Sequence, residues 1–224
     1  MDERAVRRYA ASVLAGMVSG AVWVGVVSRL AMLVLARTNP ETDGIRSDDD
    51  FEIGRFTLSG SLNLLVVGVL LGALGGSLYV GLRGLRVGPA WFQLVSITFA
   101  PAVVALAVLV HPNGVDFTLL RPLGLAVGLF LVVLWGYTLT VALLAERWLR
   151  PGGFAETMPR WLVIAGLPSF GFFPVPIGLL LGRLVLRAAG PALATRLALP
   201  ARAVLLGVFS VAVVDLVSDL RELS

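Results

Sequence analysis

The side chains of this chain that could do chemistry are few, and most lie within or beside long apolar stretches. Arg29 and Asp215 each interrupt an apolar run, whereas Asn63 and Gln93 lie close to the ends of two others. Charged side chains inside a membrane span are rare, usually face the protein interior and usually have a partner. These four residues are therefore candidates for a transport or binding role, with Asn63 and Gln93 equally explained as interface residues.

The apolar stretch over residues 161–182 contains Pro168, Pro174 and Pro176, so it is not expected to form an uninterrupted helix. Each interior proline removes a backbone hydrogen bond. Freed carbonyl groups at membrane depth are tolerated only where protein or a water-filled cavity receives them. Broken helices of this kind often form solute sites in transporters. A kinked helix that only packs against its neighbours is the simpler interpretation, and we prefer it.

Acidic side chains are concentrated in one long polar loop, residues 37–60. Three consecutive aspartates there could offer oxygen ligands to a hard cation such as Ca²⁺, and a histidine and an aspartate of the second loop on that side could join them. The spacing does not follow the Asp-x-Asp-x-Asp-Gly pattern, however, and adjacent side chains of an extended segment point to opposite faces. We therefore expect a solvated acidic loop without a tightly bound metal or a cofactor. The candidate ligands are Asp48, Asp49, Asp50, Glu52, His111 and Asp116.

Signatures of enzymes are missing from the sequence. There is one histidine and no cysteine, and neither Gly-x-Ser-x-Gly nor His-Glu-x-x-His occurs. No glycine-rich phosphate loop with a lysine occurs either. Intramembrane aspartyl chemistry needs two facing acids, and Asp215 has only Asp219, nearer the end of its segment, on the same helical face. Enzymatic activity is therefore not expected.

The composition places these residues in a membrane protein. Of the 224 residues, 58% are hydrophobic and 14% are charged, whereas soluble domains carry about 25% charged residues. This difference excludes a soluble enzyme, a nucleic-acid-binding domain and a disordered tail. All 18 basic residues are arginines, and they lie singly or in small groups between apolar runs, so we interpret them as a topology signal rather than a nucleic-acid surface.

Six apolar segments are long enough to be membrane helices, which need about 20 mostly apolar residues. They predict an all-α, polytopic transmembrane bundle that forms a single domain. The first segment is too long for the apolar region of a signal peptide, so we expect it to remain as a helix. The predicted segments are 9–36, 62–82, 91–110, 122–144, 161–182 and 203–220, with the polar loop 37–60 after the first.

The distribution of arginines predicts which end of the bundle faces the cytoplasm, because short cytoplasmic loops are enriched in basic residues. With a cytoplasmic N-terminus, the arginines before the first segment and after the second and fourth segments lie inside. The four arginines between residues 183 and 202 do not fit, since six crossings place them outside. Either the fifth segment is re-entrant, or residues 183–202 form an amphipathic interfacial helix. We take six crossings as the first expectation.

Topology also decides whether the two charged residues of the spans can meet. With six crossings, Arg29 near the outer boundary and Asp215 near the inner one cannot pair. If the fifth segment is re-entrant, the rise of 1.5 Å per residue places Asp215 about 12 Å below the outer boundary, within reach of the long Arg29 side chain. An Arg29–Asp215 pair is therefore expected only with the C-terminus outside.

Glycines spaced four residues apart predict close contacts between helices. Gly68, Gly72 and Gly76 form such a ridge, and Gly16/Gly20, Gly124/Gly128 and Gly178/Gly182 form shorter pairs. Small residues at i and i+4 let two backbones approach in lipid, where no hydrophobic effect drives helices together. We expect the triple ridge to be a packing surface.

A weak internal match suggests parallel two-helix repeats. Phe56-Thr57-Leu58 leads into the second segment, and Phe117-Thr118-Leu119 leads into the fourth on the same predicted side. In a parallel repeat the two motifs would occupy equivalent places.

We therefore expect a non-catalytic inner-membrane protein of a bacterium, with a structural, accessory or partner-binding role. The alternative is a small transporter or solute-binding membrane subunit that uses the proline-broken fifth segment, and an intramembrane enzyme is a third, less favoured interpretation. The expected partners are the lipid bilayer and copies of itself or other subunits bound through glycine-rich helix faces, but not nucleic acid.

Overall fold

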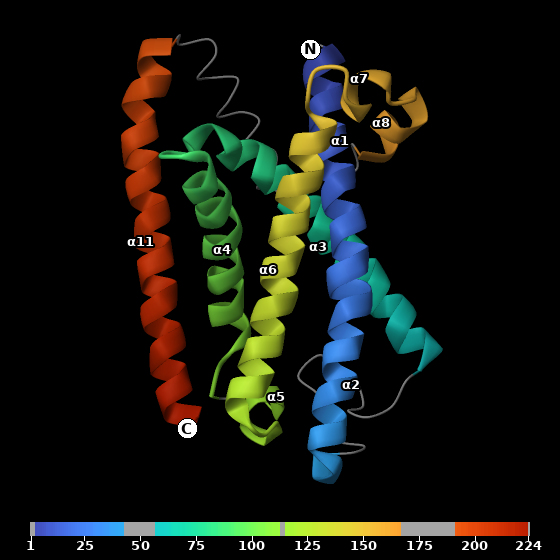
Figure 1. Ribbon diagram of the computed structural model, residues 1–224, viewed down its shortest axis with the longest axis vertical. Coiled ribbons are helices and arrows are strands. Elements are labelled where there is room, and N and C mark those ends of the chain that lie inside the picture. The colour runs from blue at the N-terminus through green and yellow to red at the C-terminus, as the bar shows by residue number, and fades with distance from the viewer. Residues whose placement is uncertain (1–2, 43–56, 113–114, 167–190, 224) are drawn as a thin grey trace.

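The computed structural model describes residues 3–42, 57–112, 115–166 and 191–223, and in these residues every regular element is a helix. The chain folds into a bundle of long helices joined by short ones (Figure 1). The elements are α1 (Glu3–Gly20), η1 (Ala21–Val27), α2 (Ser28–Thr38), η2 (Pro40–Thr42), α3 (Leu58–Leu82), η3 (Arg83–Leu85), α4 (Ala90–Leu109), α5 (Val115–Leu119), α6 (Leu123–Trp148), α7 (Phe154–Thr157), α8 (Arg160–Gly166) and α11 (Pro191–Leu223).

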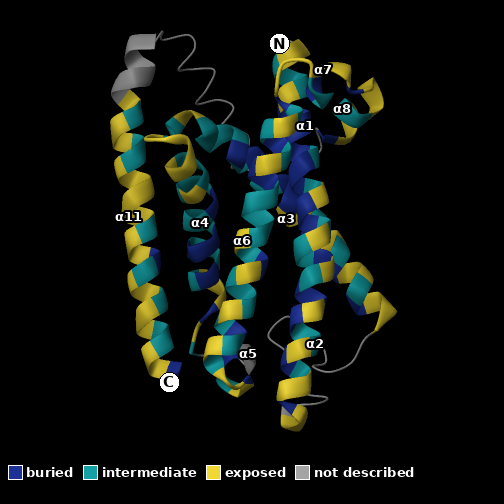
Figure 2. Cartoon of the chain, in the orientation of Figure 1, coloured by how far each residue is buried: buried dark blue, intermediate teal, exposed yellow. Residues whose placement is uncertain are grey.

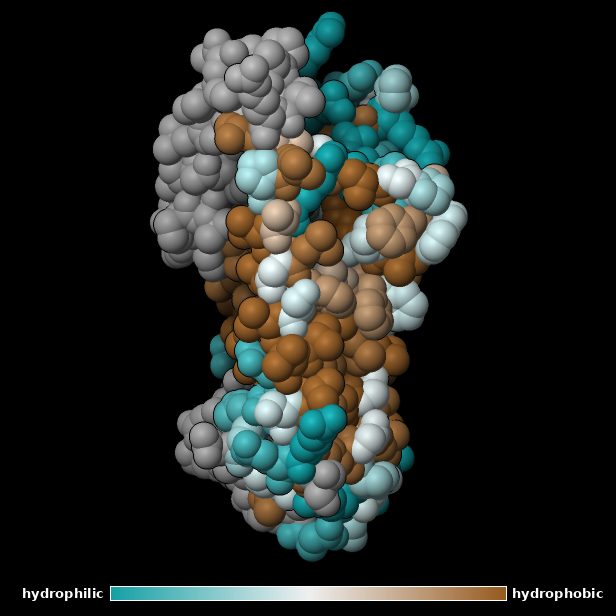
Figure 3. Space-filling model, turned by 90° about the vertical axis from the view of Figure 1, so that its left-hand side faces the viewer, coloured by the Kyte–Doolittle hydropathy of each residue, from teal (hydrophilic) through white to brown (hydrophobic). Residues whose placement is uncertain are grey.

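Within the described residues, five helices are long and apolar enough to cross a membrane, which confirms the predicted helical bundle. Six segments were expected, and the fifth of them, 161–182, is described only as far as Gly166. An apolar belt separates two hydrophilic ends on the face in Figure 3. The five candidate spans are Glu3–Thr38, Leu58–Leu85, Ala90–Leu109, Leu123–Trp148 and Leu197–Leu223.

The last helix runs in the same direction as the first, so the two ends of the chain lie at opposite ends of the bundle (Figure 1). Near its start, Arg202 Nε donates to Leu85 O at 3.0 Å; near its end, Leu223 O accepts from Arg121 Nη1 at 3.1 Å. The expectation of six alternating crossings is therefore wrong for this helix. The arginines that precede it indicated its direction correctly, because Arg202 lies at the N-terminal end of the bundle.

The glycine ridge of α3, which was expected to be a packing surface, packs directly on α1 and forms the most extensive helix–helix contact of the described residues. A Cβ built at Gly72 would lie 2.3 Å from Gly16 O, and one built at Gly76 would lie 2.2 Å from Ser12 O. Only glycine leaves room for this crossing, and the buried residues of Figure 2 gather around it. Two side-chain hydrogen bonds reinforce it, from Ser12 Oγ to Gly76 O and between the Tyr9 and Ser77 hydroxyls, each at 2.8 Å.

Most buried apolar side chains of the described residues belong to two large clusters, one at each end of the bundle, and a third, smaller cluster joins Tyr9 and Val13 of α1 to Ala73 of α3. The cluster at the N-terminal end joins α1, α3 and α6 to the short helices α7 and α8, and its buried members include Tyr79 and Met158. The cluster at the opposite end joins α2, α4, α5 and α6 to the end of α11 and includes Leu35 and Leu223. These two clusters fix the ends of the bundle.

The described helices form two hairpins that run in the same direction, α1–α2 with α3 and α4 with α6. The two Phe-Thr-Leu motifs nevertheless play different parts. Thr57 caps α3, since its Oγ1 accepts from Gly60 N at 3.2 Å, whereas Phe117–Leu119 belongs to the separate helix α5. The arrangement is compatible with a repeat, but the motif that suggested it is not equivalent in the two halves.

Candidate functional site

Asp215 is the charged residue of the candidate spans whose surroundings are least expected. It lies on α11 and is exposed on the surface of the bundle. Only 6% of the residues in the apolar window of α11 are buried, against 56% for the span Glu3–Thr38. A charged side chain in a span normally faces the protein interior. Asp215 thus occupies a surface that, in a membrane, would meet lipid.

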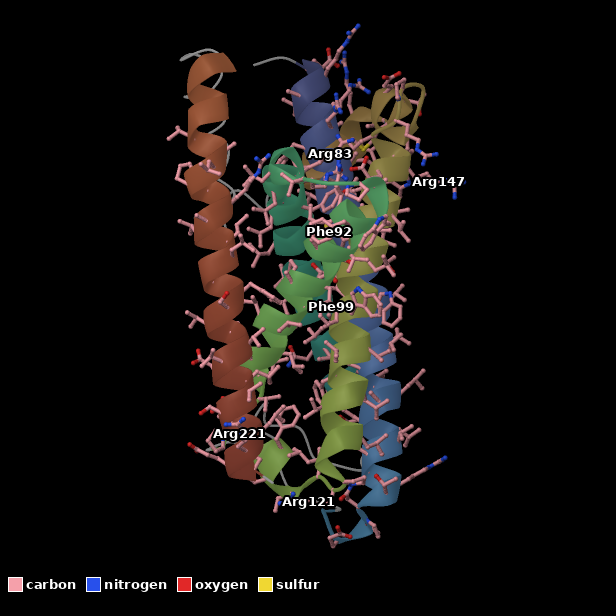
Figure 4. The ribbon with its side chains drawn as sticks, turned by 60° about the vertical axis from the view of Figure 1, so that its left-hand side comes forward. Arg83, Phe92, Phe99, Arg121, Arg147 and Arg221 are labelled. Carbon is pink, nitrogen blue, oxygen red and sulfur yellow. The ribbon has the colours of Figure 1, made fainter. Side chains whose placement is uncertain are left out.

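The depth of Asp215 follows from its position along α11. Arg202 and Leu223 are 21 residues apart, which is about 31 Å of helix, close to the thickness of a bilayer's hydrocarbon core. Asp215 precedes Leu223 by eight residues and therefore lies about 12 Å inside that end. Arg221 and Arg121 mark the same end in Figure 4, opposite to Arg83 and Arg147. The carboxyl group is well inside the apolar belt.

The residues on the same strip of α11 as Asp215 are small or β-branched. Val204, Val208 and Val211 precede it at helical spacing and are 65%, 49% and 60% exposed. At Gly207, an added Cβ would meet no atom within 4 Å. We call Val204, Gly207, Val208, Val211 and Asp215 the α11 face. It combines a smooth apolar surface with a single carboxyl group.

Arg29, in contrast, lies where the sequence predicts, inside the bundle. It is 7% exposed, on the first turn of α2, directly after the π-helical segment η1. Both η1 and α2 pack against α6. Within η1 the ring of Trp23 lies against Gly136, and Trp23 Nε1 donates to Thr140 Oγ1 at 2.8 Å. The π-helical turns thus hold Arg29 and Trp23 toward the interior, a kind of irregularity that is frequent at functional sites.

The two charged residues do not form a pair, although the last helix has the direction that would permit one. Asp215 is exposed on α11, which packs on α4 (Figure 1), whereas Arg29 is buried where α2 meets α6. Helices α4 and α6 separate the two side chains. The direction of α11 was a necessary condition for the pair but is not a sufficient one.

A cluster of polar side chains that the sequence analysis did not single out joins α3 to α6 near the N-terminal end of the bundle. Glu146 accepts two hydrogen bonds from Arg83, from Nε at 2.7 Å and from Nη2 at 2.6 Å. Arg86 Nη2 lies 3.1 Å from the same carboxylate, and the Tyr79 hydroxyl donates to it at 2.7 Å. Tyr79 and Arg83 are four residues apart and so share one helix face, and this spacing was the sequence feature that could have indicated the cluster. The cluster clamps the end of α3 to α6.

The proposed metal ligands are not brought together in the part of the chain that the structure describes. Asp48, Asp49, Asp50 and Glu52 lie outside the described residues, and no group of three potential ligands occurs within them. His111 is exposed, and its Nδ1 lies 3.0 Å from Leu109 O. Asp116 belongs to α5.

The remaining intramembrane candidates give less support for a binding or transport site. Asn63 is exposed near the start of α3, and Gln93 Nε2 donates to Gly88 O at 2.7 Å in the loop before α4. Both positions fit interface residues. Pro168, Pro174 and Pro176 lie outside the described residues.

No family model matches the chain, and no curated protein or solved structure shows significant similarity to it. Its function is therefore inferred from the placement of its own residues.

Proposed function

We propose that the protein is a non-catalytic, multi-pass membrane protein that acts by binding a partner within the membrane through the α11 face. The observation that carries this proposal is the exposed carboxyl group of Asp215, about 12 Å inside the apolar belt. An ionised carboxylate facing lipid at that depth costs several kcal/mol, so charged residues there usually pair with one another or with backbone groups. The α11 face fits a transmembrane helix that offers an arginine, a lysine or a hydrogen-bond donor at the same depth.

The use of the other polar side chains supports a binding role over a transport role. Trp23 donates to Thr140, Thr138 Oγ1 donates to Thr98 O at 2.7 Å, and Tyr137 OH donates to Leu71 O at 3.1 Å. Each of these bonds joins two helices of the chain itself. The transporter alternative rests on prolines that lie outside the described residues and on Arg29 and Asp215, which lie on different helices and form no pair with each other.

The charges at the two ends of the bundle support an N-terminus in the cytoplasm, the orientation that we propose for a bacterial inner-membrane protein. Among the described residues, arginines clearly outnumber acids at the N-terminal end but not at the opposite end, and basic residues are retained on the cytoplasmic side. The N-terminal end includes the arginines Arg4, Arg7, Arg8, Arg83, Arg86, Arg147, Arg150, Arg160 and Arg202 and the glutamates Glu3, Glu146 and Glu156. The opposite end includes the arginines Arg37, Arg121 and Arg221 and the acids Glu41, Asp116, Asp219 and Glu222.

Site-specific photo-cross-linking tests the partner, and the absence of native cysteines makes it direct. A benzophenone attached to Val211→Cys is expected to give one discrete protein adduct in native membranes, because Val211 lies one turn from Asp215 on the α11 face. The adduct is expected to fall at least fivefold when Asp215→Leu is added. Mass spectrometry of the adduct distinguishes a second copy of the chain from another protein.

The matched control is Val66→Cys on α3, a valine 56% exposed, against 60% for Val211. It is expected to label lipid without a discrete protein adduct. Equal adducts at the two positions, or an adduct that persists unchanged with Asp215→Leu, would contradict binding through the α11 face.

A further inference from the structure

The short helices α7 and α8, which follow α6, pack beside α1 at the N-terminal end of the bundle (Figure 1). Ala155 and Met158 are buried in the core cluster there, and Arg7 Nη1 donates to Met158 O at 2.7 Å. Two large apolar side chains of α8 are instead exposed, Trp161 at 66% and Ile164 at 65%. The two short helices therefore have one face in the protein core and an apolar face outside it.

Several arginines lie at the same end of the bundle as this exposed apolar face, and the acids of that end among the described residues are engaged elsewhere. Glu3 pairs with Arg7 at 3.1 Å, and Glu146 is held by the clamp on α3. The third glutamate of this end, Glu156, accepts from Gly152 N at 3.0 Å. Four exposed arginines of this end, Arg8, Arg147, Arg150 and Arg160, form no ion pair with the described residues.

We propose that these four arginines, together with Trp161 and Ile164, form a binding surface for anionic phospholipids, which we call the basic collar. Tryptophan is enriched where headgroups meet acyl chains. Each arginine close to an anionic leaflet contributes about 1 kcal/mol to binding, and its planar guanidinium group can bind phosphate through two hydrogen bonds. Phosphates would bind the arginines while acyl chains cover Trp161 and Ile164.

A lipid fits the collar better than an acidic protein or a free phosphate ion does. Trp161 and Ile164 follow Arg160 on α8, so apolar and basic side chains share one short helix, just as a phospholipid carries its negative charge directly above its hydrocarbon chains. A phosphate ion would leave Trp161 and Ile164 uncovered. The collar lies on α6–α8 and α1, away from the α11 face, so this inference does not rest on the proposed partner.

The test is a titration of the full-length chain, purified in an uncharged detergent, with short-chain phosphatidylglycerol, phosphatidylcholine and inorganic phosphate. We expect phosphatidylglycerol to bind at least tenfold more tightly than phosphatidylcholine, and phosphate not to compete. The double variant Arg150→Gln with Arg160→Gln should bind phosphatidylglycerol about tenfold more weakly or worse, because it lacks two arginines.

The control exchanges two arginines at the opposite end, Arg37→Gln with Arg221→Gln, and is expected to bind phosphatidylglycerol as the native chain does. A melting curve of each variant without lipid separates loss of binding from loss of folding. Equal affinity for the two lipids, competition by phosphate, or equal weakening in both double variants would overturn the proposal.

Discussion

Replacing Gly72 by leucine is expected to separate α3 from α1 and to destabilise the whole bundle. A Cβ at this position would lie 2.3 Å from Gly16 O and 2.9 Å from Met17 Cα. Both are backbone atoms in the middle of a long helix, so they cannot move aside as a side chain could. Overpacking of a tight contact costs about 1–3 kcal/mol, and we expect Gly72→Leu to reach or exceed the upper end. Thermal unfolding and monodispersity in a mild detergent measure the effect.

The matched control is Gly128→Leu on α6. Gly128 also belongs to a pair of glycines four residues apart, but a Cβ there meets no atom within 4 Å. The same substitution should therefore change the melting temperature little. A Gly72→Leu variant as stable as the Gly128→Leu variant would show that α1 and α3 do not cross at the glycine ridge.

Removing the carboxylate of Glu146 is expected to have the second largest effect. Glu146→Ala leaves Arg83, Arg86 and the Tyr79 hydroxyl without the group to which they all bind. Removing one partner of a buried ion pair costs about 3–5 kcal/mol. The side chains of Glu146 and Arg83 are 27% and 29% exposed, so water recovers part of this loss, and we expect the free energy of unfolding to fall by about 2–3 kcal/mol. Chemical denaturation in detergent measures the change.

The comparison variant for Glu146 is Glu3→Gln. Glu3 also pairs with an arginine, Arg7, but its side chain is 72% exposed, and surface pairs contribute about 0–1 kcal/mol. Adding Arg83→Leu to Glu146→Ala should restore part of the stability, because the pair is then removed as a whole. Similar losses for Glu146→Ala and Glu3→Gln would argue against a structural clamp between α3 and α6.

The helical class and the main packing surface could be predicted because both depend on local sequence patterns. Apolar runs of about 20 residues predict helices directly, and the spacing of Gly68, Gly72 and Gly76 marks a helix face without knowledge of what lies opposite. The partner glycines, Gly16 and Gly20, were visible as a pair of the same kind. The burial of Arg29 followed from the cost of exposing a charge to lipid.

The direction of the last helix and the Glu146 clamp could not be derived in the same way. An apolar run has no direction, so the predicted topology depended on the arginines between residues 183 and 202. The sequence left two explanations for them open, a re-entrant fifth segment or an interfacial helix. The clamp joins Arg83 to Glu146, 63 positions further along the chain, and nothing local to Glu146 indicates this. Asp215 violates the general expectation that charges in spans face inward, and only the packing of α11 reveals this.

The most direct measurement is the side of the membrane on which each terminus lies, since it tests both the direction of α11 and the proposed cytoplasmic location of the N-terminal end. Alkaline phosphatase, which is active only outside the cytoplasm, is fused after Ser224, and a cytoplasmic reporter is fused before Met1. We expect both reporters to be active, with the C-terminus outside and the N-terminus inside. An inactive phosphatase at Ser224 together with an active N-terminal reporter would place both termini on one side and contradict the observed direction of α11.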